Sequence, residues 1–248
     1  MPASFTFSPI ALVRSPYRDK FAVPRQPGLV PAGTGEVILL GDCNREETLR
    51  GLDGFSHLWL TFVFDRVIGQ GWKPMVRPPR LGGNRRQGVF ATRSPFRPNP
   101  IGLSVVSLLG IEHRAGQWVL KVGGIDLVDN TPILDIKPYL PWVDAVAEAR
   151  GGFAEEAPHQ SVKVAFSDAC RAQLVSLRAD YPALEELIRQ IIAQQPQPAY
   201  HPRKESDRDY GMALYTFNIR WRASGRHCLV YAIDPLEPRH GQGSRPLA

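Results

Sequence analysis

The first half of the chain places short apolar runs between turns rich in Pro and Gly, which is typical of β-structure. The densest run, Phe55–Phe64, is full of aromatic and branched residues and predicts a buried strand. Glu46–Leu52 fits one short helix. Many short strands with few helices favour a barrel or a sandwich. The other strands predicted here are Ser8–Arg14, Gly35–Leu40, Gly88–Thr92, Gly102–Leu109 and Trp118–Val122.

The last third of the chain predicts a mixed α and β module. Ser167 is placed to N-cap a helix that runs to about Asp180, and Pro182 can begin the next helix. The second helix has apolar residues at the spacing of one buried stripe. The stripe consists of Leu184, Leu187, Ile188, Ile191 and Ile192. The strands predicted around the helices are Val162–Phe166, Tyr215–Arg222 and His227–Ile233.

A change of composition separates the two parts. From Asp144 to Gln160 the chain is rich in Ala, Glu, Gly and Pro and has few large apolar residues, which is typical of a linker. We therefore expect a mainly β domain over residues 1–145, a linker over residues 146–160 and a small α+β domain over residues 161–248.

Composition argues against several classes of protein. The apolar and charged fractions, 43% and 22%, are ordinary for a globular domain. The sequence has no run of about 18 apolar residues that could span a membrane, and its N-terminus lacks the apolar segment of a signal peptide. The three cysteines are far apart, which argues against disulfides and against a Cys-x-x-Cys metal site. We expect a cytoplasmic protein without membrane contact.

The charge of the chain indicates an anionic partner. The formal net charge is +6, and residues 66–111 contain eight basic residues and no acidic one. A solvated surface normally mixes both signs. A stretch of one sign suits phosphates or carboxylates, and nucleic acid is the commonest such partner. The eight are Arg66, Lys73, Arg77, Arg80, Arg85, Arg86, Arg93 and Arg97.

Several common catalytic motifs are missing from the sequence. It has no G-x-x-x-x-G-K-[ST] phosphate-binding loop, no G-x-S-x-G nucleophile motif and no G-x-G-x-x-G after a strand. The six histidines lack the spacing of metal ligands. A Rossmann-type cofactor site and a histidine metal centre are therefore not expected.

One candidate segment is Gly88–Leu103, GVFATRSPFRPNPIGL. Its prolines hold the backbone extended, so that four polar side chains can present fixed donors to a carboxylate, a phosphate or a base. These are Arg93, Ser94, Arg97 and Asn99. The alternative is a turn-rich surface loop with solvated arginines. The residues alone leave both interpretations open.

A second candidate segment is Gly123–Leu140, in which three aspartates lie among apolar residues. Buried carboxylates need partners. The aspartates could bind a divalent metal, pair with Arg93 or Arg97, or act as a base or polar clamp in a site. A metal would require more oxygen ligands than this segment contains. The three are Asp126, Asp129 and Asp135.

Both segments belong to a set of long and unusual motifs. The set comprises PRQPG, FSHLW, RPPRLGG, ATRSPFRPNPIG, GGIDLVDNTPILDIKPYLPW and FNIRWR. Through them the chain, from Phe7 to about Pro235, resembles the TsaA-like family and most closely its bacterial TrmO branch. The resemblance implies an N-terminal β-barrel, unlike the Rossmann methyltransferases, with a small α+β C-terminal domain.

The resemblance also implies a function. The protein would be an S-adenosylmethionine-dependent tRNA methyltransferase that acts as a homodimer without a metal. Its reaction would be methylation of the N6 nitrogen of N6-threonylcarbamoyladenosine, next to the anticodon of tRNA. The alternatives are a non-catalytic regulator that binds S-adenosylmethionine or RNA, a methyltransferase of the same fold with a small-molecule substrate, and a metal-dependent nuclease that uses the three aspartates.

Residues that contact the cofactor are implied where the family motifs match. They lie in PRQPG, after FSHLW, in ATRS, at the end of the Asn-Pro-Ile-Gly turn and at the start of the acidic segment. The family pattern usually has a histidine where this chain has Asp65. The cofactor-binding residues so implied are Gln26, Pro27, Gly28, Asp65, Arg66, Arg93, Leu103, Gly123, Gly124, Ile125 and Asp126.

The chemistry of this reaction assigns further roles. The ureido N6–H is a poor nucleophile until its proton leaves, and Asp126 or Asp129 is expected to accept that proton. Arg93 or Arg97 would hold the threonyl carboxylate. Asn99 is expected to face the modified adenosine.

The C-terminal part is expected to contact the tRNA. In Tyr215–Arg222 apolar and polar residues alternate, so that Arg220 and Arg222 share the polar face of a strand. Together with Tyr200, Arg220 would bind RNA through stacking and phosphate contacts. The alternative is solvated charge on an exposed strand.

Overall fold

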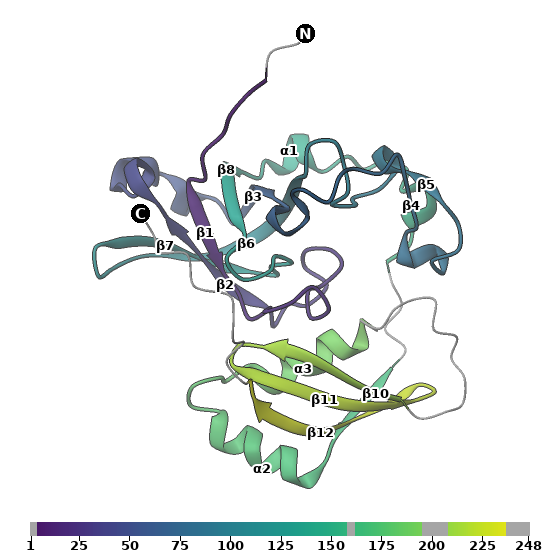
Figure 1. Cartoon of the computed structure of the whole chain (residues 1–248). Helices are drawn as coiled ribbons and strands as arrows, with labels where there is room; N and C mark the ends of the chain where they lie inside the picture. Colours follow the sequence, from purple (N-terminus) through teal and green to yellow (C-terminus); the bar gives the residue numbers. More distant parts are fainter. Residues whose placement is uncertain (1–3, 158–161, 195–207, 237–248) are drawn as a thin grey trace.

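The computed structural model describes residues 4–157, 162–194 and 208–236, and six strands of its N-terminal part close into an antiparallel barrel (Figure 1). The order of strands around the barrel is β1-β2-β7-β6-β3-β8. The mainly β fold class predicted from the sequence is confirmed. The six strands are β1 (Ala11–Arg14), β2 (Thr34–Leu39), β3 (His57–Val63), β6 (Ile101–Arg114), β7 (Gln117–Gly123) and β8 (Pro132–Pro138).

Alternating side chains fill the barrel. In β3, Leu58, Leu60 and Phe62 are buried, while the positions between them are partly exposed. Burial of each such side chain contributes about 1.5–3 kcal/mol. The ring of Phe62 lies across Gly102 of β6, where a Cβ atom would come within 2.2 Å of a ring carbon. The glycine of the Asn-Pro-Ile-Gly motif is therefore required by packing inside the barrel.

Three long connections emerge at the same end of the barrel, which we call the loop end. Because neighbouring strands are antiparallel, the end of β7 lies beside the start of β2, and the end of β3 lies beside the starts of β6 and β8. The three motifs that carry the expected site therefore share one end of the barrel. The connections cover residues 15–33, 64–100 and 124–131.

The connection between β3 and β6 carries a short two-stranded arm. Met75–Val76 (β4) pairs with Gln87–Gly88 (β5), and Figure 1 shows this arm projecting from the barrel. The single strand predicted over Gly88–Thr92 is wrong, because a 3₁₀ turn over Val89–Ala91 follows β5 directly. The helix predicted over Glu46–Leu52 is also wrong, since this segment forms separate 3₁₀ turns.

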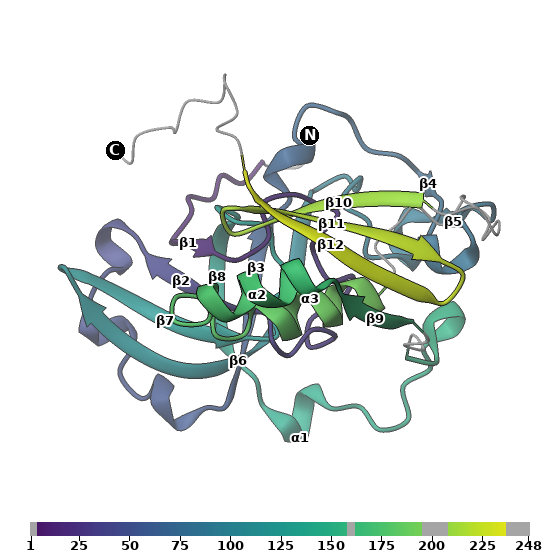
Figure 2. The same cartoon turned by 90° about the horizontal axis from the view of Figure 1, so that it is seen from below.

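A four-stranded sheet and two helices form the C-terminal part (Figures 1 and 2). The strand order is β10-β11-β12-β9, and only the β12–β9 pair is parallel among these described strands. Its elements are β9 (Lys163–Phe166), α2 (Asp168–Leu177), α3 (Leu184–Ala193), β10 (Arg208–Leu214), β11 (Phe217–Ser224) and β12 (His227–Pro235). A further short helix, α1 (Pro141–Asp144), follows the barrel.

The two predicted helices of the C-terminal part are confirmed. The hydroxyl of Ser167 accepts a hydrogen bond from Cys170 N (3.3 Å), which caps α2. All five residues of the predicted stripe in α3 are buried. The alternation predicted for the strand before Ser224 is also confirmed, because Ile219 and Trp221 are buried while Arg220 and Arg222 are exposed.

The C-terminal part packs against the connection between β1 and β2. Tyr17 is fully buried and forms a β-bridge with Leu214. Pro16 O accepts a hydrogen bond from Tyr215 N (2.8 Å). The side-chain carbonyl of Gln190 in α3 accepts a hydrogen bond from Ala32 N (2.9 Å). The connection that carries PRQPG is therefore held between the barrel and the C-terminal part.

None of the helices in the described ranges is both long and apolar enough to cross a membrane.

Candidate functional site

Backbone hydrogen bonds join two of the connections at the loop end. Gly28 N donates to Gly124 O (2.8 Å), and Ile125 N donates to Gly33 O (3.2 Å). Gly124 has a φ of +67°, and a Cβ atom there would lie 3.1 Å from Gly28 Cα. Backbone conformation and space both favour glycine at position 124. The segments PRQPG and GGID are therefore held directly against each other.

Arg93 brings the third connection to the same place. Its Nη1 donates a hydrogen bond to Oε1 of Gln26. Its positive charge is also close enough to Asp126 to influence the ionisation of that carboxyl group. The structure thus brings together Gln26, Gly28, Arg93, Gly124 and Asp126, which lie far apart in the sequence.

The carboxyl group of Asp126 lies in a mainly buried environment. Burial raises its pKa from the ordinary 3.8 to about 6. A hydrogen bond from the Ser104 hydroxyl and the charge of Arg93 act in the opposite direction and favour the ionised form. A carboxyl group with this pKa is ionised at neutral pH and can still accept a proton, which suits a general base.

Ser104 is a site residue that the sequence reasoning missed. It belongs to β6 and is fully buried, between the inward-facing residues Gly102 and Val106. Its hydroxyl donates to Oδ1 of Asp126. A polar residue at an inward position of a predicted strand was the available signal, because a buried hydroxyl needs a partner.

The carboxylate of Asp129 accepts hydrogen bonds from the connection that follows β1. Its Oδ1 accepts from Ser15 N (3.1 Å), and its Oδ2 accepts from Arg18 Nη1 (2.7 Å). The predicted pairing with Arg93 or Arg97 is wrong for this residue, because the connection that follows β1 supplies a closer arginine. With both oxygens engaged, Asp129 is a poor candidate for the base, which leaves Asp126.

Asp135 lies apart from the other two aspartates. It belongs to β8, where its carboxylate pairs with Lys137 and accepts from Ile136 N (2.9 Å). Across the described ranges, no group of three or more His, Cys, Asp or Glu residues could hold a metal ion. The metal interpretation of the acidic segment therefore gains no support from the geometry.

Asp65 and Arg66 form a separate contact. They begin a 3₁₀ turn after β3, and burial raises the pKa of Asp65. Arg66 donates to the backbone carbonyls of Arg18 (3.3 Å) and Asp129 (3.1 Å). The guanidinium of Arg66 therefore fixes the acidic segment and is directed at Asp129, not at the contact between Gln26 and Arg93.

The other expected site residues of the Gly88–Leu103 segment lie in different environments. Arg97 is half-buried and donates to Thr92 O within its own loop (3.2 Å). The side chain of Asn99 is exposed. Leu103 is 53% exposed and lies on the opposite face of β6 from Ser104, because neighbouring residues of a strand alternate. Its side chain therefore points away from Asp126.

The remaining residues expected at the cofactor lie around the contact between PRQPG and GGID. Pro27 is half-buried between Gln26 and Gly28, and Gly123 pairs with Thr34 at the end of β7. Ile125 is fully buried in the core. The side chain of Ile125 therefore anchors the GGID segment in the core, and only its backbone atoms can contact a ligand.

The residues expected to contact tRNA are only partly described. Tyr200 lies outside the described residues. Arg220 forms an ion pair with Asp234 (2.8 Å), and Arg222 forms one with Asp209 (2.9 Å). Both guanidinium groups also lie over the ring of Tyr231, at 5.5 and 5.8 Å from its centre. The positive charge of this strand face is therefore largely compensated within the sheet.

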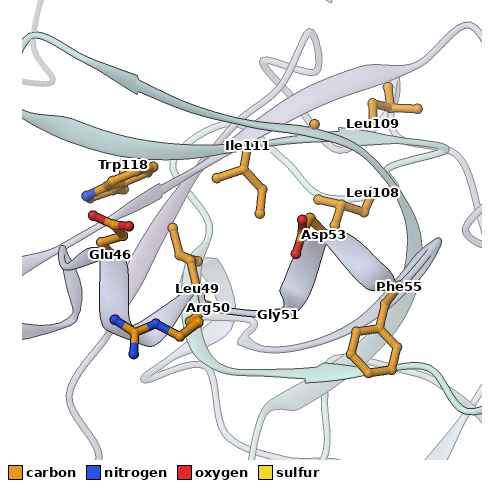
Figure 3. Close-up of a pocket in the computed structure, with 11 residues that line it drawn as sticks. Glu46, Leu49, Arg50, Gly51, Asp53, Phe55, Leu108, Leu109, Ile111 and Trp118 are labelled. Atoms are coloured by element: carbon orange, nitrogen blue, oxygen red, sulfur yellow. The ribbon is translucent and has the colours of Figure 1, made fainter.

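A cavity of about 540 Å³ lies near the opposite end of the barrel, where the β6–β7 hairpin faces the 3₁₀ turns before β3 (Figure 3). None of the residues predicted for the site lines it. We place the site at the loop end, because the predicted residues converge there. The cavity is lined by Glu46, Leu49, Arg50, Gly51, Asp53, Phe55, Leu108, Leu109, Gly110, Ile111 and Trp118.

Comparison with known proteins agrees with the motifs. The family model of the tRNA-methyltransferase O N-terminal domain matches residues 12–145, and that of the TrmO C-terminal domain matches residues 159–236. The tRNA (adenine(37)-N6)-methyltransferase of Escherichia coli K12 is 48% identical over 94% of this chain and 99% of its own length. A putative S-adenosylmethionine-dependent methyltransferase, RcsF, of Pseudomonas aeruginosa is 48% identical over 92% of this chain and 96% of its own length.

Solved structures show the same relationship. A crystal structure of TrmO from Pseudomonas aeruginosa superposes with a TM-score of 0.77 at 40% sequence identity, covering 94% of this chain and 98% of that chain. Both family domains are matched in order, and the chain spans nearly the full length of these relatives. The chain therefore belongs to the tRNA-methyltransferase O family.

Proposed function

We propose that this protein is an S-adenosylmethionine-dependent tRNA methyltransferase that methylates the N6 nitrogen of N6-threonylcarbamoyladenosine next to the anticodon. The observation that carries the proposal is the convergence of Gln26, Arg93, Ser104 and Asp126 at the loop end. The barrel and its connections would form the catalytic domain, residues 1–145. Residues 146–160 would form the linker, and residues 161–248 a second domain that contacts tRNA.

The donor set at the loop end fits the cofactor. S-adenosylmethionine, when bound, supplies an electrophilic methyl group on a sulfonium. Arg93 can bind the carboxylate of its methionyl part, and the amide of Gln26 can accept from or donate to its polar groups. The backbone of Gly28 and Gly124 lacks side chains that would keep a ligand away. Leu103, Asp65 and Arg66 remain proposed contacts that the resemblance alone supports.

Asp126 is the proposed base. Its carboxylate would accept the proton of the ureido N6–H, which would make this nitrogen nucleophilic toward the methyl group that bound S-adenosylmethionine would supply. The hydroxyl of Ser104 holds the carboxylate in place and favours its ionised form. Arg97 keeps guanidinium donors beyond its bond to Thr92 O, and it is proposed to hold the threonyl carboxylate beside Asn99.

Mass spectrometry of nucleosides tests the proposed function. Two tRNA samples of one sequence, with and without the threonylcarbamoyl group, are incubated with the protein and labelled S-adenosylmethionine. We expect label in N6-threonylcarbamoyladenosine alone. Label in both samples would overturn the choice of substrate. Label in neither, with cofactor bound, would favour the non-catalytic regulator. Label in a small molecule, when a metabolite extract replaces the tRNA, would favour the methyltransferase with a small-molecule substrate.

The exchange of Ser104 for alanine should shift the pH dependence of the reaction. Removing the hydroxyl removes a hydrogen bond to ionised Asp126, so that the pKa of Asp126 rises above about 6. Asp126 can act as a base only when it is ionised, so the rate of methyl transfer increases as pH rises through its pKa. In the variant this increase should occur at higher pH. Single-turnover rates measured between pH 5 and 9 locate the increase in both proteins.

Two features make this test specific to Ser104. The other groups that interact electrostatically with Asp126 are Arg93 and Tyr17, and burial raises the pKa of Tyr17, which therefore stays neutral between pH 5 and 9. Ser104→Thr keeps the hydroxyl and should keep the wild-type profile. An identical profile in Ser104→Ala would show that the hydrogen bond does not tune the base.

A homodimer is part of the proposal. Ile101, Leu103 and Leu109 expose 40–58% of their surface on β6, and exposed apolar side chains of neighbouring positions often mark an interface. Sedimentation velocity of the full chain distinguishes a dimer from a monomer.

A further inference from the structure

The connection between β3 and β6 exposes large apolar side chains among its basic residues. Trp72 is 54% exposed, Phe90 77% and Met75, at the start of β4, 49%. Figure 1 shows the β4–β5 arm standing away from the barrel; Met75 begins β4, Trp72 precedes it by three residues, and Phe90 follows β5 in the 3₁₀ turn. Contiguous apolar side chains on a soluble protein usually mark the place where a partner binds. We call Trp72, Met75 and Phe90, with the basic residues of this connection, the arm surface.

Backbone hydrogen bonds place the arm surface next to the proposed site. Lys73 N donates to Phe96 O (3.1 Å), and Val89 N donates to Pro74 O (3.0 Å). The segments that carry Trp72 and Phe90 therefore run side by side. Phe90 is also in the 3₁₀ turn that leads, three residues later, to Arg93. The arm surface is therefore continuous along the chain with the segment that carries Arg93.

The positive charge of the arm surface is not compensated by ion pairs. None of the eight basic residues between positions 66 and 111 lies within ion-pair distance of a carboxylate in the described part of the chain. The C-terminal sheet differs, since Arg220 and Arg222 are both paired there. Unpaired arginines and lysines on an exposed arm attract a polyanion.

We propose that the arm surface binds the single-stranded anticodon loop of the substrate tRNA. Nucleobases stack on the indole of Trp72 and the ring of Phe90, while the neighbouring basic side chains contact phosphates. Exposed rings among unpaired cations are the combination that binds single-stranded RNA, because every base has a stacking face and every linkage a charge. This inference rests on the proposed function and names the surface that delivers the modified adenosine to Asp126.

A second copy of this chain is a less suitable occupant. In a symmetric contact the same patch meets itself, so that the unpaired cations of one arm surface would face those of the other. Like charges at short distance repel each other. RNA is a more suitable occupant, because its phosphates carry the opposite charge and its bases have faces that can stack on aromatic rings.

The double variant Trp72→Ala/Phe90→Ala tests the proposal in the full chain. We expect its Kd for tRNA carrying the modified adenosine to rise about 100-fold, since each of the two stacked bases contributes roughly a factor of ten. Its Kd for S-adenosylmethionine should stay unchanged. The slope of log Kd against log salt concentration should also stay unchanged, because stacking releases no counterions. Trp72→Phe/Phe90→Tyr keeps the rings and should bind within a few-fold of wild type.

Matched variants separate stacking from charge and from general exposure. Arg85→Gln/Arg86→Gln should weaken tRNA binding and lower the salt slope, because phosphate contacts are lost. Phe5→Ala removes a ring that is 80% exposed outside the basic stretch, and it should leave tRNA binding unchanged.

Three outcomes would overturn the proposal. The first is that the alanine double variant binds tRNA as tightly as wild type. The second is that Phe5→Ala loses as much tRNA affinity as the double variant. The third is that the sedimentation coefficient changes in the alanine double variant and in no other variant, which would make the arm surface an interface between copies. Failure of the proposed function is distinct, because it would show as absent methylation by the wild type. Binding of tRNA can be measured in either case.

Discussion

Replacement of Asp126 by asparagine should reduce methyl transfer by about 100- to 10,000-fold, the usual contribution of a positioned general base. Asparagine has nearly the same shape and can still accept the hydrogen bond from Ser104, but it cannot accept a proton from the substrate nitrogen. The loss should therefore appear in the single-turnover rate at saturating cofactor and tRNA. The Kd for S-adenosylmethionine should change by no more than a few-fold.

The same substitution should not destabilise the protein. The folded-state pKa of Asp126, about 6, lies above its ordinary value of 3.8, so the folded protein holds a proton that the unfolded chain has already lost. The stability that this group contributes is thus present below pH 3.8 and lost as pH rises through about 6. At pH 8 the asparagine variant should melt at the same temperature as wild type or at a higher one.

Asp135→Asn is the matched control, because it removes an aspartate of the same segment whose side chain is 45% exposed on β8. It should leave the rate unchanged. If Asp126→Asn lost cofactor affinity and recovered its rate at saturating cofactor, Asp126 would be a cofactor ligand and not the base. An unchanged rate would remove Asp126 from both roles.

Replacement of Asp129 by alanine should lower the free energy of unfolding by about 3 kcal/mol. The change leaves Ser15 N and the half-exposed guanidinium of Arg18 without the buried carboxylate that accepts their hydrogen bonds, and the loss of such a buried acceptor costs about 3 kcal/mol. Asn130 also loses the bond from its side-chain nitrogen to Oδ2 (3.0 Å). For a chain of this size the melting temperature should fall by roughly 6–12 °C.

Thermal unfolding followed by circular dichroism measures this loss. Asp135→Ala should change the melting temperature by no more than about 1–2 °C, because the pair with Lys137 is exposed to solvent. The rate of folded Asp129→Ala at low temperature is the second readout. A folded variant with wild-type stability but no activity would show that Asp129 takes part in the chemistry after all.

The C-terminal part has a role that the linear sequence did not suggest. The bonds from Tyr215 N to Pro16 O and from Ala32 N to Gln190 connect it to the segment that holds Gln26. We therefore expect removal of residues 160–248 to disturb the proposed cofactor contacts as well as the proposed binding of tRNA. Point substitutions, such as those in the arm surface, separate the two functions more cleanly.

Local patterns determined much of the fold. The buried stripe of α3, the cap at Ser167 and the alternation in β11 each depend on neighbouring residues, and each was confirmed. The strand β8 was not predicted, because its proline, aspartate and lysine obscure the alternation, and its place between β1 and β3 is decided by pairing across the barrel. In place of the strand expected over Gly88–Thr92, β5 pairs with β4 and ends at Gly88, and a 3₁₀ turn follows.

The sequence by itself determined which chemical groups are available: an acid-free basic stretch, a proline-stiffened loop with two arginines, and three aspartates among apolar residues. It could not decide which aspartate meets which arginine, because these partners lie many residues apart and meet only where the barrel brings its connections to one end. The tertiary structure decided that Asp129 is tied to Arg18 and that Asp126 lies with Ser104 near Arg93. It also decided that, among the described residues, the basic side chains of the arm surface form no ion pair with a carboxylate. The reason is physical: a carboxylate acts as a base or as a structural anchor according to its burial and its donors, and both are properties of the folded chain.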